Sequence, residues 1–596
     1  QSFTAPQEGD ESALAAIWAE LLRLDNGAIS AGDSFFALGG HSLLAVRLLA
    51  EIRERLKVEL TVRDLFEAPL LSAQAALIAS KRGGELLPPV LPQPRDAGAS
   101  EIRLPLSFAQ QRLWLLDQLT TDGSLYNISA LLHVQGEFQA SLAESAFREL
   151  IARHEPLRTL FFAEAGLAHQ VIRTAFAFRL DQVDLTLLTP SQQEQAIQAA
   201  AERDARQPFD LAKEVLLRAA FLRTGADEGA LLFTVHHIAA DGWSMGILID
   251  EFRHIYQALL NGETPSLPAL PVNYADYAHW QREWVQRPAY QAQLAWWQRQ
   301  LADLPLVHSL PLSHPRPLQP GNSGDRYRFS LNADATQALH RLAAEEHATL
   351  FMLLHAAFAL LLARHGGSHD IVIGVPVANR PHASLTPLVG FFVNSLVLRV
   401  AYQPDLAFRA FLRQVKAVNI DAQMRQDVPF EQLVATLNPE RSPRHAPLFQ
   451  IMFSMDNDLL QPAPVGNCRF TRRQHPVTPA RFELLLNVVE QQGALSCQFD
   501  YNTALFEAEY IVQLAQRFSE LVNGLLRQPD AAIGALPLLD AHQQQLLLQR
   551  CNPAPERWTD ALLPQRILRQ AALTPQRVAV AWDDRQLTYQ QLCEQA

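Results

Sequence analysis

A stretch of twenty residues rich in proline and glycine divides the chain into two parts of different character. It reads KRGGELLPPVLPQPRDAGAS and begins at residue 81. This composition favours neither a helix nor a strand, so residues 81–101 are predicted to form a semi-rigid, extended linker. The chain has 596 residues, which is more than one hydrophobic core usually organises, and several domains are therefore expected.

Residues 1–80 are predicted to form a small all-helical domain. Apolar residues recur there at helical spacing, at Leu14, Ile17, Trp18, Leu21 and Leu22. A second helix is expected to begin near Ser42, and shorter helices are expected over residues 62–66 and 71–78. The four predicted helices indicate a bundle.

Residues 102–540 alternate between strand and helix patterns, which is typical of a mixed α/β domain. Residues 231–238, LLFTVHHI, predict a buried strand, and a helical pattern follows it. Residues 541–596 begin again with turn residues, a helix and two short strands, so they are interpreted as a separate, incomplete segment.

Composition excludes several classes of protein. A net charge of −12 and a pI of about 5.9 argue against a nucleic-acid partner, and no run of about 18 apolar residues predicts a membrane span. The amino terminus lacks the pattern of a signal peptide. The four cysteines are widely spaced, which fits no zinc or disulfide framework and favours a reducing cytoplasm: Cys468, Cys497, Cys551 and Cys593.

Ser42 stands in the segment DSFFALGGHSLLAVRLL, directly after two glycines and a histidine. The glycines predict a tight turn, which would put the serine at the amino end of a helix. From spacing alone, Ser42 could be a helix cap. A hydrolase nucleophile elbow, GxSxG, fits less well because Leu44 replaces the second glycine and no long strand precedes the turn.

Two histidines stand side by side in VHHIAADGWS, residues 235–244, between a predicted strand and a predicted helix. Successive strand residues face opposite sides, so only one of His236 and His237 can serve a given site. As an isolated pair they could both be structural. A zinc site is disfavoured because the only further nearby ligand is Asp241.

The segment LGGHSLLA, following DSFF within a helical unit of eighty residues, resembles the carrier domain of nonribosomal peptide synthetases. The resemblance covers the whole predicted bundle. It implies that Ser42 carries 4'-phosphopantetheine, transferred from coenzyme A by a phosphopantetheinyl transferase. A long arm with a terminal thiol can carry an acyl group between distant sites at high effective concentration.

The segment HHIAADG is similar to the HHxxxDG signature of the condensation domain of the same synthetases. Further segments match that family's motifs in order: SFAQQRLWLL, RHEPLRTLF, NYADYAHW, IGVPVANR, VGFFVNSLVLR, VPFEQL and RHAPLFQIMFSM. The resemblance covers residues 102–540. It implies two chloramphenicol-acetyltransferase-like lobes, about 102–275 and 276–540, arranged in a V around a tunnel.

The condensation resemblance implies roles for individual residues. The catalytic histidine would be His237, while His236 and Asp241 would shape the loop. Gly242 would allow a close backbone approach. No metal is implied.

Two residues of the second lobe join this predicted site. The motif match implies that Asn394, in GFFVNS, reaches it from the other lobe. Arg380 is our hypothesis for the cation that holds the Asp241 carboxylate.

The implied reaction is acyl transfer by aminolysis of a thioester, with amide bond formation. The carrier would hold a donor aminoacyl or peptidyl thioester, and the amine would come from an acceptor aminoacyl thioester on a downstream carrier. The histidine could remove the proton from the amine or orient it. SFAQQRLW resembles the subtype that accepts an L-configured donor, and LTYQQL resembles the start of an adenylation domain.

Three other functions fit the sequence less well. A scaffold with an inactive condensation fold fits poorly with a complete HHxxxDG motif. A heterocyclisation enzyme would carry aspartates in place of the histidines. An epimerisation enzyme keeps the histidines but not the SFAQQRLW segment or an adenylation-like continuation.

Overall fold

The computed structural model divides into two compact units, Gln1–Leu538 and Leu539–Ala596. The structure describes residues 3–25, 27–84, 86–95, 101–119, 123–164, 167–318, 321, 323–440, 442–457, 464–473, 475, 480–552 and 562–596.

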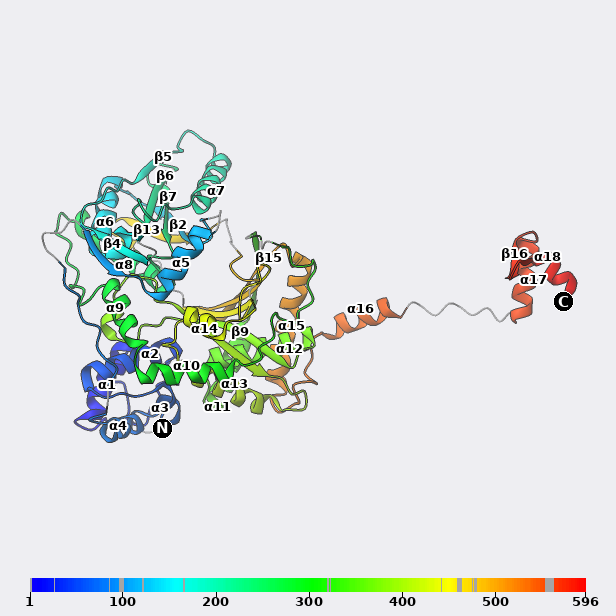
Figure 1. Cartoon of the computed structure of the whole chain (residues 1–596), viewed down its shortest axis with the longest axis horizontal. Coiled ribbons are helices and arrows are strands. Elements are labelled where there is room, and N and C mark those ends of the chain that lie inside the picture. The colour runs from blue at the N-terminus through cyan, green and yellow to red at the C-terminus, as the bar shows by residue number, and fades with distance from the viewer. Residues whose placement is uncertain are drawn as a thin grey trace. The chain divides into compact units, whose positions relative to one another are not determined.

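The chain begins with a bundle of α-helices, coloured blue in Figure 1. Its elements are α1 (Asp10–Leu22), α2 (Ser42–Glu51), a π-helical turn η1 (Ile52–Leu56), α3 (Val62–Glu67) and α4 (Leu71–Ser80). Trp18 and Phe35 are fully buried in its centre, and their rings lie 5.2 Å apart. The predicted all-helical domain is confirmed.

The first lobe of the α/β body contains a six-stranded sheet in the order β12-β13-β2-β7-β6-β5. The strands are β2 (Asn127–Gln135), β5 (Asp181–Asp184), β6 (Leu217–Arg223), β7 (Glu228–His236), β12 (Pro464–Val465) and β13 (Cys468–Arg473). In β7, Phe233 and Val235 pack into one core with α6 (Ala140–Arg153) and α8 (Gly242–Leu260), whereas Leu232 packs into another with α7 (Pro190–Arg206). Because successive strand residues point to opposite sides, β7 contributes core side chains to both faces of the sheet, and helices cover each face.

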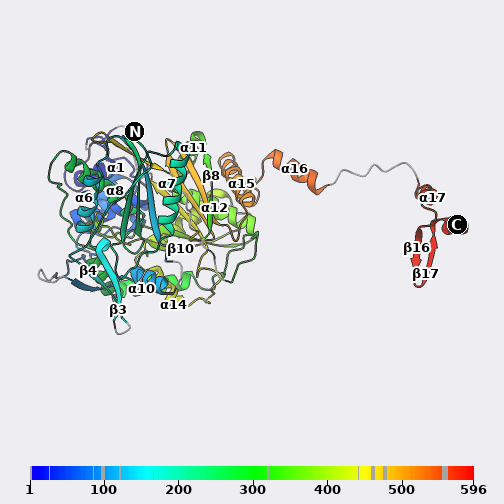
Figure 2. The same cartoon turned by 90° about the horizontal axis from the view of Figure 1, so that it is seen from above.

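The second lobe contains a six-stranded sheet in the order β10-β9-β11-β14-β15-β8. Its strands are β8 (Gly324–Leu331), β9 (Asp370–Val377), β10 (Asn394–Ala401), β11 (Ile451–Asn457), β14 (Leu484–Gln491) and β15 (Ala494–Asn502). Its main helices are α11 (Ala333–Glu345), α12 (Leu350–Gly366), α13 (Phe408–Gln423) and α15 (Ala508–Arg527). Figures 1 and 2 both show α12 beside α15, and α12 is buried over almost its whole length.

Shorter elements complete the first unit. A three-stranded sheet in the order β1-β4-β3 is formed by β1 (Glu101–Pro105), β3 (Thr159–Glu164) and β4 (Leu167–Arg173). The helices are α5 (Phe108–Leu119), η2 (Glu155–Arg158), α9 (Tyr274–Trp284), α10 (Pro288–Gln300), η3 (Ala383–Leu385) and α14 (Phe430–Leu437).

The second unit contains three helices and a hairpin among its described residues. They are α16 (Ala541–Cys551), α17 (Leu563–Leu573), β16 (Val578–Trp582), β17 (Arg585–Thr588) and α18 (Tyr589–Gln595).

The two lobes are not consecutive halves of the chain. Strands β12 and β13 lie within the range predicted for the second lobe, yet β13 pairs antiparallel with β2 of the first. The predicted boundary at residue 275 is therefore wrong for β12 and β13, which follow that residue in the chain but belong to the first lobe. An unpaired edge of β2 would expose backbone donors and acceptors, and β13 satisfies them.

No single helix within the described ranges is both long enough and apolar enough to cross a membrane. The bent pair α11 and α12 passes such a test only when the two helices are taken together, with 103° between them. Because α12 is buried inside the second lobe, its apolar composition is explained by the core.

Replacing a core leucine of α12 tests the packing of the second lobe. Leu360 is fully buried, so Leu360→Ala should lower the free energy of unfolding by about 3 kcal/mol through lost contacts and a residual cavity. Leu115→Ala is the control, because that side chain is 51% exposed and should change stability by at most about 0.5 kcal/mol. The denaturant dependence of amide exchange in α12 measures the free energy of unfolding of each variant. An equal loss of stability in the two variants would contradict the packing described.

Candidate active site

The two adjacent histidines occupy different environments at the end of strand β7. His236 is the last strand residue, is only 1% exposed, and accepts a hydrogen bond at Nδ1 from the Ile238 N–H over 3.1 Å. Its Nε2 is buried with no partner among the described atoms. Burial, and then the nearby charges, lower the pKa of His236 to about 3. This side chain therefore braces the turn.

His237 follows the strand and is half-buried. Its Nδ1 lies 2.8 Å from the Ala240 carbonyl oxygen, and its ring centroid lies 4.7 Å from that of Phe391. Because a carbonyl only accepts, Nδ1 carries the hydrogen and Nε2 keeps its lone pair. Burial, together with the positive charge of Arg481, lowers the pKa of His237 to about 3, so the ring is neutral at physiological pH.

Asp241 ties the histidine loop to the second lobe. It is 2% exposed and caps helix α8 by accepting from the Ser244 N–H over 2.8 Å. Its other oxygen accepts from the backbone N–H groups of Phe392 and Val393, over 3.1 and 3.2 Å. The carboxylate is thus fixed by groups from both lobes.

Arg380 is the cation beside this carboxylate, as expected from the sequence. Its Nη2 lies 3.4 Å from Asp241 Oδ1, and both side chains are at most 3% exposed. Its Nη1 donates to the carbonyls of Leu385 and Leu388, each over 2.6 Å. Burial lowers the pKa of Arg380, and the Asp241 carboxylate opposes that shift.

Gly242 and Asn394 have contrasting surroundings. A Cβ at position 242 would meet no atom within 4 Å, so the space beside this residue is open. Asn394 does come from the second lobe, but its amide group bonds to the backbone of Gln426, Val428 and Phe430. It therefore braces the second lobe in this structure.

The turn before Ser42 is built by two glycines. Gly39 has a positive φ of 101°, and a Cβ on Gly40 would lie 2.5 Å from the carbonyl oxygen of Phe35. Helix α2 begins at Ser42, and His41 is the residue at its N-cap position. The Ser42 side chain itself lies outside the described part of the structure.

Comparison with protein families gives matches for both parts of the first unit. The model of the condensation domain matches residues 100–548, and the model of the phosphopantetheine attachment site matches residues 12–78. The chain belongs to the condensation domain family. Its amino-terminal bundle is a carrier domain of the type that bears 4'-phosphopantetheine on a serine.

The curated relatives are nonribosomal peptide synthetases. The chain is 36% identical to a linear gramicidin synthase of Brevibacillus parabrevis over 598 residues, which cover 99% of this chain and 8% of that protein. It is 36% identical to a dimodular nonribosomal peptide synthase of Bacillus subtilis (strain 168), over 100% of this chain and 25% of the relative. The chain therefore spans a small part of these two relatives.

Solved structures share the fold. The crystal structure of the X-domain from teicoplanin biosynthesis matches with a TM-score of 0.68 and 27% identity, over 76% of this chain and 100% of that one. The four-domain nonribosomal peptide synthetase AB3403 matches with a TM-score of 0.73 and 23% identity, over 83% of this chain and 38% of that one. Condensation domains of these synthetases catalyse peptide bond formation, and the scaffold and epimerisation alternatives are not favoured.

The carrier domain lies against the condensation domain near the histidine motif. The Arg47 guanidinium of helix α2 is 5.9 Å from the ring centroid of Trp243, which follows Gly242. Arg53 donates to the Pro381 carbonyl. Farther along, Arg63 pairs with Asp421 over 2.7 Å.

Two further residues of the site were not predicted from the sequence. Ser244 Oγ lies 2.7 Å from Asp241 Oδ1 and 3.2 Å from Arg380 Nη2, so it completes the buried network. Arg481 donates to the Asn127 carbonyl over 3.1 Å and lowers the pKa of His237. The signal for Ser244 was its place at the end of the quoted motif, whereas Arg481 has no local signal.

Breaking the buried ion pair tests its role. Arg380→Ala would leave the Asp241 carboxylate buried without its cation and should lower the free energy of unfolding by about 3–5 kcal/mol. Arg380→Lys should lose less stability than Arg380→Ala, because lysine keeps the positive charge. It should still be less stable than the parent, because it cannot make both carbonyl contacts. Guanidinium denaturation provides the measurement.

A matched control is available in Arg103→Ala, which removes an exposed ion pair with Glu164 and should change stability by at most about 1 kcal/mol. Equal stability of the Arg380→Ala and Arg103→Ala proteins would show that the buried pair does not hold the lobes.

Proposed function

We propose that the carrier domain presents a donor aminoacyl or peptidyl thioester on Ser42 phosphopantetheine to the condensation domain that follows it. In this proposal the amine comes from an acceptor aminoacyl thioester on a downstream carrier. The contact between Arg47 of helix α2 and Trp243 is the observation that carries the proposal, because it brings the helix of Ser42 next to the histidine motif.

The proposed reaction is aminolysis. The amine nitrogen attacks the thioester carbonyl carbon, the C–N bond forms, and the C–S bond breaks. The proton lost by the amine is gained by the departing thiolate, which leaves as the free thiol. His237 would accept a hydrogen bond from the amine at Nε2, since Nδ1 already donates to Ala240.

A pKa of about 3 favours a positioning role for His237 over that of a strong base. Holding the amine and the thioester in a reactive geometry can supply much of the rate when the acyl group is already activated. The open space beside Gly242 would leave room for the reacting groups.

The position of Ser42 suits a phosphate ester. It is the first residue of helix α2, and the first turn of that helix contains no acidic residue. The unpaired N–H groups at a helix amino terminus favour a phosphate. A phosphopantetheinyl transferase would be the partner that attaches the arm.

We also propose the finer assignments. The segment SFAQQRLW supports a donor of L configuration, and residues 541–596 would begin an adenylation domain. Exposed apolar side chains in that second unit, including Leu563 and Leu573 at 71% each, support its belonging to a larger fold. We place the protein in the cytoplasm, in line with its widely spaced cysteines.

The mass of the intact protein tests the carrier assignment first. Incubation with coenzyme A and a broad-specificity phosphopantetheinyl transferase should add one phosphopantetheine group, and Ser42→Ala should abolish the gain. Ser80→Ala is the control, since it removes an exposed serine of the same bundle. No gain in folded wild-type protein would contradict the assignment.

The pH dependence of condensation tests the role of His237. Its lowered pKa keeps it neutral from pH 8 down to about pH 4, so the rate should follow only the acceptor amine, whose ordinary pKa is about 7.7–8.0. His237→Gln should lower the rate by about 10²-fold through lost positioning and leave that ionisation unchanged. A panel of aminoacyl-coenzyme A donors and aminoacyl N-acetylcysteamine acceptors provides the assay.

His314→Ala is the control, because His314 is half exposed, pairs with Glu507 and is not part of the proposed site. An additional ionisation near pH 6.5 in the wild type that disappears in His237→Gln would show that the histidine acts as a titrating base.

A further inference from the structure

We propose that residues 87–95 of the linker, here called the anchor segment, are a fixed part of the condensation domain. The reach of the carrier is then set by the short tether before residue 87, and the full length of the linker does not determine it. The functional meaning of this arrangement rests on the proposed donor role, but the contacts and the test do not.

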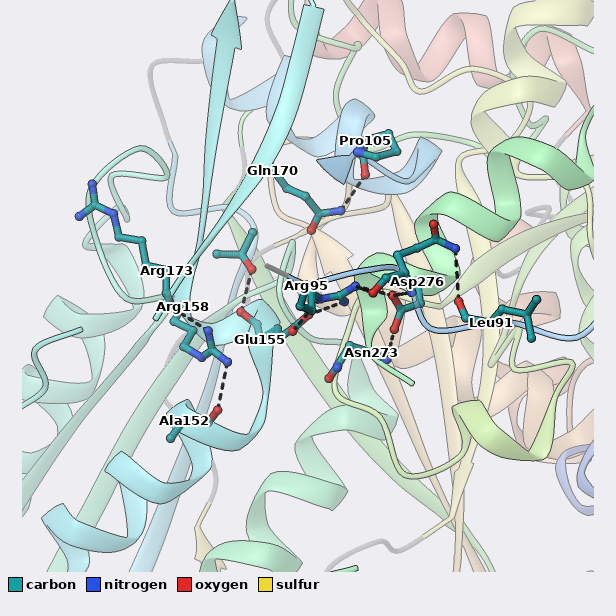
Figure 3. Close-up of polar contacts among 12 residues, drawn as sticks. Leu91, Arg95, Pro105, Ala152, Glu155, Arg158, Gln170, Arg173, Asn273 and Asp276 are labelled. Atoms are coloured by element: carbon teal, nitrogen blue, oxygen red, sulfur yellow. Dashed lines mark hydrogen bonds and ion pairs between the residues drawn. The ribbon is translucent and has the colours of Figure 1, made fainter. Parts of the chain in front are cut away.

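Arg95 makes the strongest attachment of the anchor segment (Figure 3). Its Nη1 lies 2.8 Å from Asp276 Oδ1 at the start of α9, and its Nη2 lies 3.1 Å from Glu155 Oε2 in η2. The side chains of Arg95, Asp276 and Glu155 are 22%, 1% and 10% exposed respectively. One linker residue therefore joins two elements of the condensation domain through buried charges.

Asp276 binds the backbone of the anchor segment as well as its side chain. The same Oδ1 accepts from the Gln93 N–H over 2.8 Å, while Oδ2 accepts from the Asn273 N–H over 2.7 Å and caps α9. Removing Arg95 would leave this nearly inaccessible carboxylate without its cation, which is unfavourable. The helix and the linker thus stabilise each other.

The end of the anchor segment nearest the carrier is also held. The indole N–H of Trp280 donates to the Pro88 carbonyl over 2.8 Å. Val90 is 6% exposed and packs into the core of the first unit. Polar and apolar contacts therefore fix the segment before Arg95 is reached.

The contacts of the carrier domain itself leave no buried charge unpaired when they break. Arg53, whose side chain is 13% exposed, donates to the neutral Pro381 carbonyl and keeps its ion pair with Glu59 inside the carrier. Arg63 and Asp421 form an ion pair whose side chains are 48% and 33% exposed, and Lys416 lies 5.6 Å from the ring centroid of Phe66. Exposed pairs contribute at most about 1 kcal/mol, whereas breaking a buried pair is far more destabilising. The carrier can leave its position while the anchor segment stays, with the loss of one hydrogen bond, over 3.3 Å, from the Leu87 N–H to Glu59 of the carrier.

Anchoring shortens the tether. Without it, about twenty residues would separate helix α4 from β1, and with it only about six remain before residue 87. Effective concentration falls roughly as the −3/2 power of tether length, so anchoring should raise that of the carrier beside the condensation domain about sixfold.

The test compares two double variants with the same change in net charge, made in the full chain. V90D/R95A should release the anchor segment by burying a charge and removing the clamp. L91D/R103A is the control, because Leu91 is 62% exposed and Arg103 forms an exposed pair. Hydrogen exchange of residues 87–95, which contain five non-proline residues, reports the attachment directly.

The reach of the carrier is measured by disulfide cross-linking. R63C and D421C are introduced at side chains that meet in the structure, in a background with C551S and C593S. V90D/R95A should exchange faster over residues 87–95 and cross-link about sixfold more slowly, while L91D/R103A should match the parent.

Two results would overturn the proposal. One is unprotected exchange of residues 87–95 in the parent protein, and the other is an equal cross-linking rate in the released and control variants. Neither measurement uses a donor or an acceptor, so failure here is distinguishable from failure of the condensation assay.

Discussion

The geometry of the site depends on one buried carboxylate, Asp241. Moving a carboxylate out of water is unfavourable unless it is paired and hydrogen-bonded, and here the partners come from both lobes. Arg380 and the N–H groups of Phe392 and Val393 belong to the second lobe, while Ser244 belongs to the first. The start of helix α8 and the loop before β10 can therefore be buried only together, and His237 takes its place between them.

Burial also gives the two adjacent histidines, His236 and His237, different surroundings. His236 uses Nδ1 as an acceptor for the turn, and His237 uses Nδ1 as a donor to Ala240. Both pKa values are lowered to about 3, so neither ring carries a charge at neutral pH. What distinguishes them is access, because His236 is buried and His237 is half-buried beside Phe391.

Contacts of two strengths connect the carrier domain to the condensation domain. Buried charges and a packed valine attach the linker, whereas an exposed ion pair, cation–π contacts and a hydrogen bond from Arg53 to the Pro381 carbonyl attach the bundle. A carrier that must hand over a thioester needs an attachment that can be broken repeatedly. The strong contacts therefore belong on the linker, where they limit reach without trapping the carrier.

The sequence alone determined the helical bundle, the extended linker, the mixed α/β body and the different surroundings of the two adjacent histidines. These follow from periodicity, turn residues and strand alternation, which act over a few neighbouring residues. It also suggested Arg380, because a buried aspartate needs a cation. Tertiary structure alone decided that β13 joins the first lobe and that Arg95 clamps Asp276, 181 residues away. Such pairings depend on the summed packing of whole lobes, which no local pattern records.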